Sequence, residues 1–271
     1  MPSRGDDHGP QAVNEPRLPS EQEQELHRLL HLPFATWCDL CVASKGAEEP
    51  HRGKKHGTAG LVDEVPVVQM DFFFIESLVG LSIYATELGI GSTSGVASKS
   101  VSTFAVNWAT HIFSFLGLSR IILQTDAEAS VRALAEKIAQ KRSETTQLRV
   151  APVRSHESQG GVERWHRQVE EQFRVVKSQL EKQIQATITP TMAICVWLLR
   201  HASWLLMRFQ PSTTRSGTGY YRVRGRSYSG RLVGFGETVL ALESCEKDAG
   251  GVRKQSKFKG RWVLGVWVGR T

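Results

Sequence analysis

The chain has 271 residues, 40% of them hydrophobic, which is enough to bury one medium-sized core with small flanking modules and excludes disorder throughout. Its formal net charge of +7 favours a polyanionic partner such as nucleic acid, since the basic residues concentrate after residue 140. The four unevenly spaced cysteines cannot build a disulfide framework, and no secretory signal peptide is visible, so we predict an intracellular protein.

Residues 1–25 mix Pro, Gly and charged residues without apolar periodicity and are predicted to be a disordered tail. From residue 65 the pattern becomes strand-like. Residues 65–75 and 82–90 are rich in β-branched and aromatic residues, and a glycine-containing turn between them predicts two paired strands. Apolar periodicity over 98–117 predicts a helix that stops at Gly117. We then predict, in chain order, a buried strand at 120–125, a helix at 128–142, a strand at 148–153 and a polar loop at 154–161.

A long helix is predicted from about Gly161, because apolar residues recur every three or four positions as far as Leu180. The apolar run 192–209 contains charged residues and falls short of the roughly 20 residues of a clean membrane span, so we predict a buried helix and no membrane partner. Alternating strands and helices over residues 61–210 predict an α/β domain with a sheet covered by helices. Gly-rich turns and short strands predict a small β-rich module or connector over 211–271.

Three acidic residues of the central domain stand out by position. Asp71 interrupts a buried strand, Asp126 ends a later strand, and Glu163 lies in the first turn of the long helix. An unpaired buried carboxylate is costly, and three that converge would repel one another unless divalent cations neutralise them. Oxygen ligands suit Mg²⁺ or Mn²⁺, and a pair of such ions supports phosphoryl transfer. Asp126 has a second interpretation as the N-cap of the following helix.

A possible zinc module lies ahead of this domain, in residues 26–60. Cys38 and Cys41 form a Cys-x-x-Cys pair whose two sulfurs can reach one tetrahedral Zn²⁺, and His31 is the favoured third ligand. His27 and His51 remain alternatives for the fourth position. A redox pair or two buried thiols is the competing interpretation. A segment this short has too little core to fold without metal.

The chain resembles the integrases of retroviruses and long-terminal-repeat retrotransposons, and is most similar to the copia type. The resemblance rests on the stretches QTDAEAS and SHESQGGVERWHR, and on the 54 and 36 residues that separate the three acids. It covers roughly residues 25–210. One departure is Ala127, followed by Glu128, where many members have Asn or Gly after the second aspartate. Glu157 competes with Glu163 for the third position.

The resemblance implies a ribonuclease-H-like fold in which Asp71, Asp126 and Glu163 hold the catalytic Mg²⁺ or Mn²⁺. It also implies a zinc module with two histidines and two cysteines, although here the gap between His31 and Cys38 is short. The implied activity joins element ends to target double-stranded DNA, by a homo-oligomer acting in the nucleus. The basic residues of the long helix, which are expected to contact DNA phosphates, are Arg164, Arg167, Arg174 and Lys177.

Two further functions remain open from the sequence. A catalytically decayed, zinc-dependent nucleic-acid-binding relic would keep the fold and lose the chemistry. A different nuclease on the same fold is the other alternative, and the upstream zinc-like module argues against it.

Overall fold

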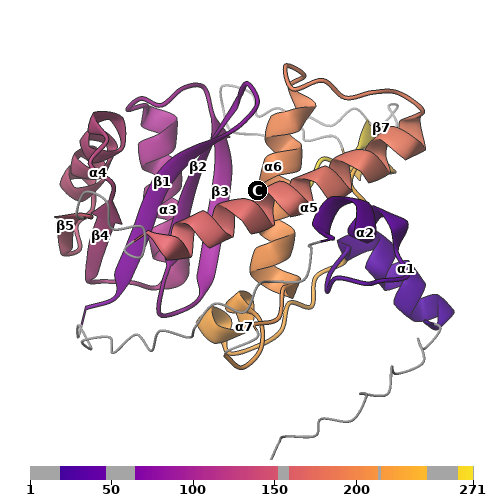
Figure 1. Ribbon diagram of the computed structural model, residues 1–271, viewed down its shortest axis with the longest axis horizontal. Helices are drawn as coiled ribbons and strands as arrows, with labels where there is room; N and C mark the ends of the chain where they lie inside the picture. The colour runs from indigo at the N-terminus through magenta and orange to yellow at the C-terminus, as the bar shows by residue number, and fades with distance from the viewer. Residues whose placement is uncertain (1–18, 47–64, 152–158, 213–214, 243–261, 271) are drawn as a thin grey trace, which may run out of the picture.

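The computed structural model describes residues 19–46, 65–151, 159–212, 215–242 and 262–270. His51, Glu157 and most of the predicted disordered tail lie outside these residues. A five-stranded sheet forms the centre (Figure 1), with the strand order β3-β2-β1-β4-β5. Its strands are β1 (Val67–Ile75), β2 (Leu78–Ala85), β3 (Ile90–Val96), β4 (Ile121–Thr125) and β5 (Thr146–Val150).

The strand directions make this a mixed sheet. β1, β2 and β3 are antiparallel neighbours, whereas β4 pairs with β1 and β5 with β4 in parallel. Parallel neighbours need crossover connections, and helices supply them here. The helices of the central domain are α3 (Thr103–Leu116), α4 (Ala129–Lys141), α5 (Gly160–Ile184) and α6 (Ile194–Phe209). The predicted mixed sheet flanked by helices is confirmed.

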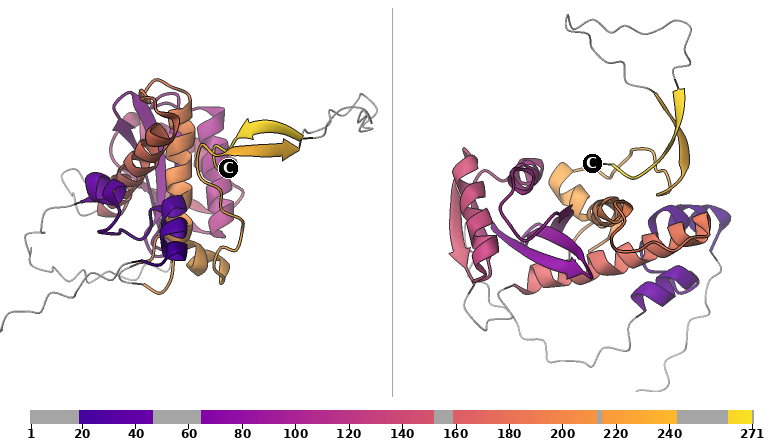
Figure 2. Two further views of the ribbon diagram at one scale, coloured as in Figure 1. Left: turned by 90° about the vertical axis from the view of Figure 1, so that its right-hand side faces the viewer. Right: turned by 90° about the horizontal axis from the view of Figure 1, so that it is seen from above.

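The two faces of the sheet bury different cores because successive strand residues point to opposite faces. Val68, Met70 and Phe72 of β1 join the core beneath α3 and α4. Phe73 joins the other core, which is formed with α5 and α6. Figure 2 shows the sheet between these two layers.

Two short helices precede the sheet; the second packs against α5, and the first is joined to α5 by hydrogen bonds from Gln172 and Gln179 (Figure 1). They are α1 (Glu21–Leu30) and α2 (Asp39–Lys45). α1 begins inside the predicted disordered tail, so the boundary at residue 25 was wrong. The reason is a capping box, in which the Ser20 side chain accepts from the Glu23 backbone N–H and the Glu23 carboxylate accepts from Ser20.

The predicted strand 82–90 also needs correction, because it merges the end of β2 with the first residue of β3. The β1–β2 turn is formed by Glu76 and Ser77, without glycine, and Gly80 lies inside β2. A Cβ at Gly80 would lie 2.2 Å from the ring of Phe73, so glycine is required there for packing. β3 was missed because its sequence, IGSTSGV, lacks the usual composition of a strand.

The C-terminal segment differs from the predicted β module. Residues Gly219–Arg224 form helix α7, where short strands were expected, because Thr218 caps the helix and Gly225 ends it with a left-handed backbone. Phe235 belongs to the core of α5 and α6, so this part of the chain packs on the central domain. Strands β6 (Thr238–Leu242) and β7 (Trp262–Val266) form an antiparallel ribbon that projects from the body (Figure 2).

Candidate active site and metal centre

Asp71 and Asp126 lie side by side on neighbouring strands. The parallel register pairs Val67 with Ile122 and Gln69 with Gln124, and continuing it by two residues places Asp71 opposite Asp126. Asp126 directly follows the last residue of β4, where the chain turns into α4. The fold therefore brings together two of the three predicted catalytic acids.

The electrostatics of this site disfavour the charged form of Asp71. Burial, and after it the negative charge of Asp126, raises the pKa of Asp71 to about 7. The backbone N–H of Phe72, which donates to Asp71 Oδ1 over 2.8 Å, and the charge of Lys99 oppose this rise in pKa only in part. Two neighbouring carboxylates, of which Asp71 has a raised pKa, form the kind of donor set that a hard divalent cation would fit.

Asp126 also contacts the start of α4. The backbone N–H of Glu128 donates to Asp126 Oδ1 over 3.0 Å, which is a turn of the kind that Asp commonly forms before a helix. The N-cap residue itself is Glu128, whose side chain makes no capping hydrogen bond. Glu128 instead pairs with Lys99 Nζ at 2.8 Å. One oxygen of Asp126 thus bonds the backbone, as the capping interpretation expected, and this role is compatible with metal binding through the other oxygen.

Glu163 lies on the same face of the sheet as Asp71. Two contacts of β1 fix the first two turns of α5: Gln69 accepts a hydrogen bond from the Val162 N–H at 2.8 Å, and Phe73 stacks on His166 with ring centroids 4.3 Å apart. Asp71 lies between Gln69 and Phe73 on β1, and Glu163 lies between Val162 and His166 on α5. The two contacts therefore hold the part of α5 that carries Glu163 against the part of β1 that carries Asp71.

The side chain of Glu163 is nevertheless exposed and does not close the site. Among the described residues, the only group of three or more ligands within mutual reach of one metal ion is elsewhere, in the N-terminal module. The carboxylates that raise the pKa of Asp71 are Asp126 and, more weakly, Glu128. The structure thus brings Asp71 and Asp126 together, whereas Glu163 lies on the first turn of α5 and does not join them in one group of ligands.

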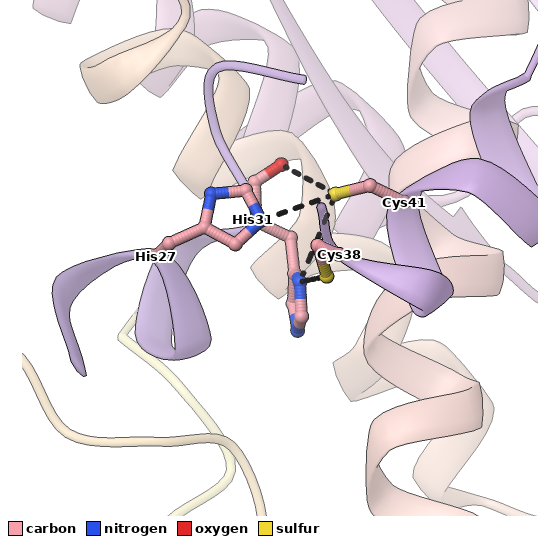
Figure 3. Close-up of side chains that lie close together, drawn as sticks. All are labelled: His27, His31, Cys38 and Cys41. Atoms are coloured by element: carbon pink, nitrogen blue, oxygen red, sulfur yellow. Dashed lines mark hydrogen bonds between the residues drawn. The ribbon is translucent and has the colours of Figure 1, made fainter. Parts of the chain in front are cut away.

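His27, His31, Cys38 and Cys41 converge in the N-terminal module (Figure 3). Their ligand atoms all lie within 4.8 Å of one another. The Cys41 sulfur lies 3.3 Å from His27 Nε2, and the Cys38 sulfur lies 3.5 Å from His31 Nδ1. These separations fit a tetrahedron around Zn²⁺, since zinc bonds of about 2.0–2.3 Å place neighbouring ligand atoms about 3.3–3.8 Å apart.

Local structure explains why these four residues meet. His27 and His31 are one helical turn apart at the end of α1, where the backbone of His31 is left-handed and ends the helix. Cys38 precedes the first residue of α2 and Cys41 lies within it. Burial lowers the pKa of His27, and it lowers that of His31 to about 4, so both imidazoles are kept in the neutral form that ligates metal.

Side chains of α5 hold this module in place. Gln179 Oε1 lies 3.1 Å from His31 Nε2, while its amide nitrogen donates to the Arg28 carbonyl. Gln172 is fully buried and donates to the Leu30 carbonyl over 2.8 Å. Sequence reasoning missed both glutamines, as well as Gln69. For Gln172, the sequence did offer a signal: a polar residue at a position of the long helix that is buried against the rest of the protein.

The basic residues expected to bind DNA lie in two different settings. Arg164 and Arg167 are exposed on the first turns of α5. Arg174 donates to the Ser44 carbonyl of the N-terminal module, and Lys177 pairs with Glu181 at 2.7 Å. The second pair therefore has structural partners.

In the described part of the chain, none of the helices is both long and apolar enough to cross a membrane.

The sequence matches no protein-family model and no curated protein. The solved structures to which the chain is similar include the following two. The catalytic core domain of BIV integrase has a TM-score of 0.40 and 16% identity, over 58% of this chain and 92% of that chain. A chain of the simian T-cell lymphotropic virus intasome in complex with the PP2A regulatory subunit B56 gamma has a TM-score of 0.47 and 14% identity, over 84% and 76%.

Proposed function

We propose that the protein is a polynucleotidyl transferase, which attacks a DNA phosphodiester with water or a 3′ hydroxyl. The observation that supports this most is the alignment of Asp71 with Asp126 on neighbouring strands, with Glu163 on a helical turn anchored on both sides of Asp71. Two close carboxylates and a third acid on the same face suit divalent-cation chemistry better than acid–base catalysis by one group.

Asp71, Asp126 and Glu163 are the proposed ligands of two Mg²⁺ or Mn²⁺ ions. Such ions activate the attacking oxygen and stabilise the leaving oxygen of an in-line displacement. The rigid β1–β4 pair fixes the two aspartates, and a rotation of the exposed Glu163 side chain on its anchored turn would bring the third carboxylate to them. Arg164 and Arg167, on the same turns, are proposed to contact the DNA backbone.

A structural zinc ion is proposed for the N-terminal module, held by His27, His31, Cys38 and Cys41. The tetrahedral spacing of the four donor atoms supports it. Four protein ligands fill the coordination of a structural zinc ion, so the site does not need His51.

The wider context is proposed from the sequence resemblance: a copia-type retrotransposon integrase that processes element ends and inserts them into target double-stranded DNA. It would act as a homo-oligomer in the nucleus. Continuation of the neighbouring genomic DNA into an open reading frame for a reverse transcriptase would test this origin.

Strand transfer on a labelled duplex carrying a recessed 3′ end tests the enzymatic proposal. The zinc-loaded protein should join DNA in Mn²⁺ or Mg²⁺, and Asp71→Asn, Asp126→Asn and Glu163→Gln should each abolish joining. Glu136→Gln, an exposed acid on α4, is the matched control and should retain activity. A parent that joins no DNA, or triad variants that join it as the parent does, would contradict the proposal.

A decayed nucleic-acid-binding protein is the second candidate, and the contacts around Asp126 favour it. Glu128 and its ion pair with Lys99 occupy the turn after the second aspartate, and Glu163 lies away from both aspartates. Such a protein would bind DNA with a steep dependence on salt and would never cut it, with or without Mn²⁺.

A further inference from the structure

A cavity of about 390 Å³ lies on the flank of α5 away from Asp71. Gly161, Arg164 and Gln168 of α5 line one wall, and they lie on a different face of the helix from Glu163 and His166. The turn between β2 and β3 and the described residues 210–212, 215, 219 and 222 complete it. The cavity is therefore distinct from the carboxylate site, although Glu163 and Arg164 are consecutive residues.

Three arginines line this cavity, and the described lining residues include no aspartate or glutamate. Arg215 and Arg222 both approach Gly89, where a Cβ would lie 2.7 Å from Arg215 Nη1 and 3.3 Å from Arg222 Nη2. Like charges held this close repel, and the pKa of Arg222 is lowered first by burial and then by Arg215. A bound anion would remove this conflict.

The hydrogen bonds of the arginines show which of them are available to a ligand. Arg222 is committed to the fold, since it donates to the carbonyls of Leu88, Gly89, Ser216 and Gly217. Arg215 uses Nη2 for the Thr86 carbonyl, and Arg164 uses Nε for the Gly160 carbonyl. Their other guanidinium nitrogens have no partner among the described residues, so Arg164 and Arg215 can present donors to a phosphate.

Apolar side chains form part of the cavity floor. They are Ile90, Trp165, Leu206 and Met207, and all four are buried. Its volume lies in the range of about 300–1,000 Å³ that is typical of small-molecule sites. A cationic rim over an apolar floor suits a ligand with a charged group and a flat apolar body, which is the chemistry of a nucleotide.

We propose that this cavity binds one nucleotide unit of a single-stranded DNA segment, with the phosphate on Arg164 and Arg215 and the base against the apolar floor. The choice of DNA as the source rests on the proposed function, since α5 carries both Glu163 and Arg164. A strand that crosses the N-terminal turn of α5 would reach from the carboxylates to the cavity. An isolated mononucleotide has the same chemistry and is the alternative source.

Binding of fluorescent hexathymidylate to the zinc-loaded full chain, measured by anisotropy without added Mg²⁺ or Mn²⁺, tests the proposal. Arg215→Ala should weaken binding about tenfold, in the range expected for the loss of one phosphate or stacking contact. Gln168→Trp, which fills the cavity without changing charge, should weaken it similarly. Arg132→Ala, at an exposed arginine on α4, is the control and should bind within twofold of the parent.

The ligand arms separate the sources. Unlabelled thymidine 5′-monophosphate should compete far more weakly than the oligonucleotide, and equal competition by the monophosphate would overturn the DNA assignment. A blunt duplex of equal charge should bind less tightly than the single strand. Photo-crosslinking of an oligonucleotide containing 5-iododeoxyuridine to the parent should label Tyr84 or Trp165, and this measurement needs no variant to fold. Labelling only on α4 or on the β6–β7 ribbon, or variants that bind as the parent does, would overturn the proposal. The anisotropy assay measures binding and not catalysis, so a protein that is inactive in strand transfer can still bind the oligonucleotide. Failure of the proposed function and failure of the cavity proposal are therefore distinguishable.

Discussion

The backbone N–H of Val162 donates a hydrogen bond of 2.8 Å to the side-chain Oε1 of Gln69. This contact joins the first turn of α5 to the middle of β1, two residues before Asp71. Backbone N–H groups in the first turn of a helix have no partner within the helix, so a buried one needs a partner from elsewhere. Gln69 thereby fixes where α5 begins and how close Glu163 comes to the aspartates.

Gly161→Ala should disturb this junction. An added Cβ would lie 2.5 Å from Gln69 Oε1 and 3.0 Å from the ring of Tyr84, so either the Gln69 side chain or α5 has to shift. We expect the free energy of unfolding to fall by about 1–3 kcal/mol, as for other overpacked sites. Strand transfer should fall further, up to about 100-fold, because small displacements of catalytic groups are costly. Urea denaturation and the joining assay measure the two effects.

Gly160→Ala is the matched control for that substitution. A Cβ at Gly160 meets nothing within 4 Å, and alanine favours helix over glycine, so stability should be unchanged or should rise by up to about 1 kcal/mol. If the two variants behaved alike, glycine would matter here for backbone freedom and not for the close approach to β1.

Gln179→Ala should weaken zinc binding although Gln179 contacts no metal. Its amide nitrogen donates to the Arg28 carbonyl, which orients Oε1 to accept from His31 Nε2–H and leaves His31 Nδ1 to face the thiols. Loss of such an outer partner typically lowers metal affinity about 10–100-fold. Competition with a colorimetric zinc chelator measures this change. Gln183→Ala, on the exposed side of the same helix, should retain the affinity of the parent, and equal affinities in all three proteins would contradict the prediction.

Asp71→Asn should stabilise the metal-free protein while it abolishes catalysis. At pH 8 the Asp71 carboxylate is charged, although burial and the neighbouring Asp126 disfavour that charge. Removing it should raise the free energy of unfolding by about 1–3 kcal/mol, the trade-off expected at a strained functional site. Added Mg²⁺ should then stabilise the parent more than the variant. Glu76→Gln, at the tip of the same hairpin, should change neither quantity, and a destabilised Asp71→Asn protein would count against the repulsion.

The sequence predicted the parts of this fold in which one local pattern dominates. α5 and α6 carry long apolar stripes, and Gly117 ends α3 with a left-handed backbone as its position suggested. β3 could not be predicted in this way, because its small residues are selected by what packs on them. A Cβ at Gly91 would lie 2.4 Å from the indole of Trp165, a partner 74 positions away in sequence.

The candidate site shows the same division. Residue type and spacing were enough to select Asp71, Asp126 and the Cys38–Cys41 pair, since each combines an unusual position with a clear ligand chemistry. The choice of His27 required the fold, because the left-handed end of α1 decides which histidines face the thiols. The roles of Arg174 and Lys177 also depend on contacts that spacing cannot reveal.

Two histidines buried in the neutral form should make the protein sensitive to acid. Burial lowers the pKa of His166 and of His201 to about 4, from the ordinary 6.5 that each regains on unfolding. Between pH 4 and 6.5 the unfolded chain therefore binds protons that the folded chain does not bind. Stability is retained above pH 7 and is lost as the pH falls from 6.5 towards 4. Each histidine contributes up to about 3 kcal/mol to this loss. His201→Leu should flatten the decline in urea denaturation between pH 7.5 and 4.5, at equal zinc content, and an unchanged slope would show that His201 becomes protonated without unfolding.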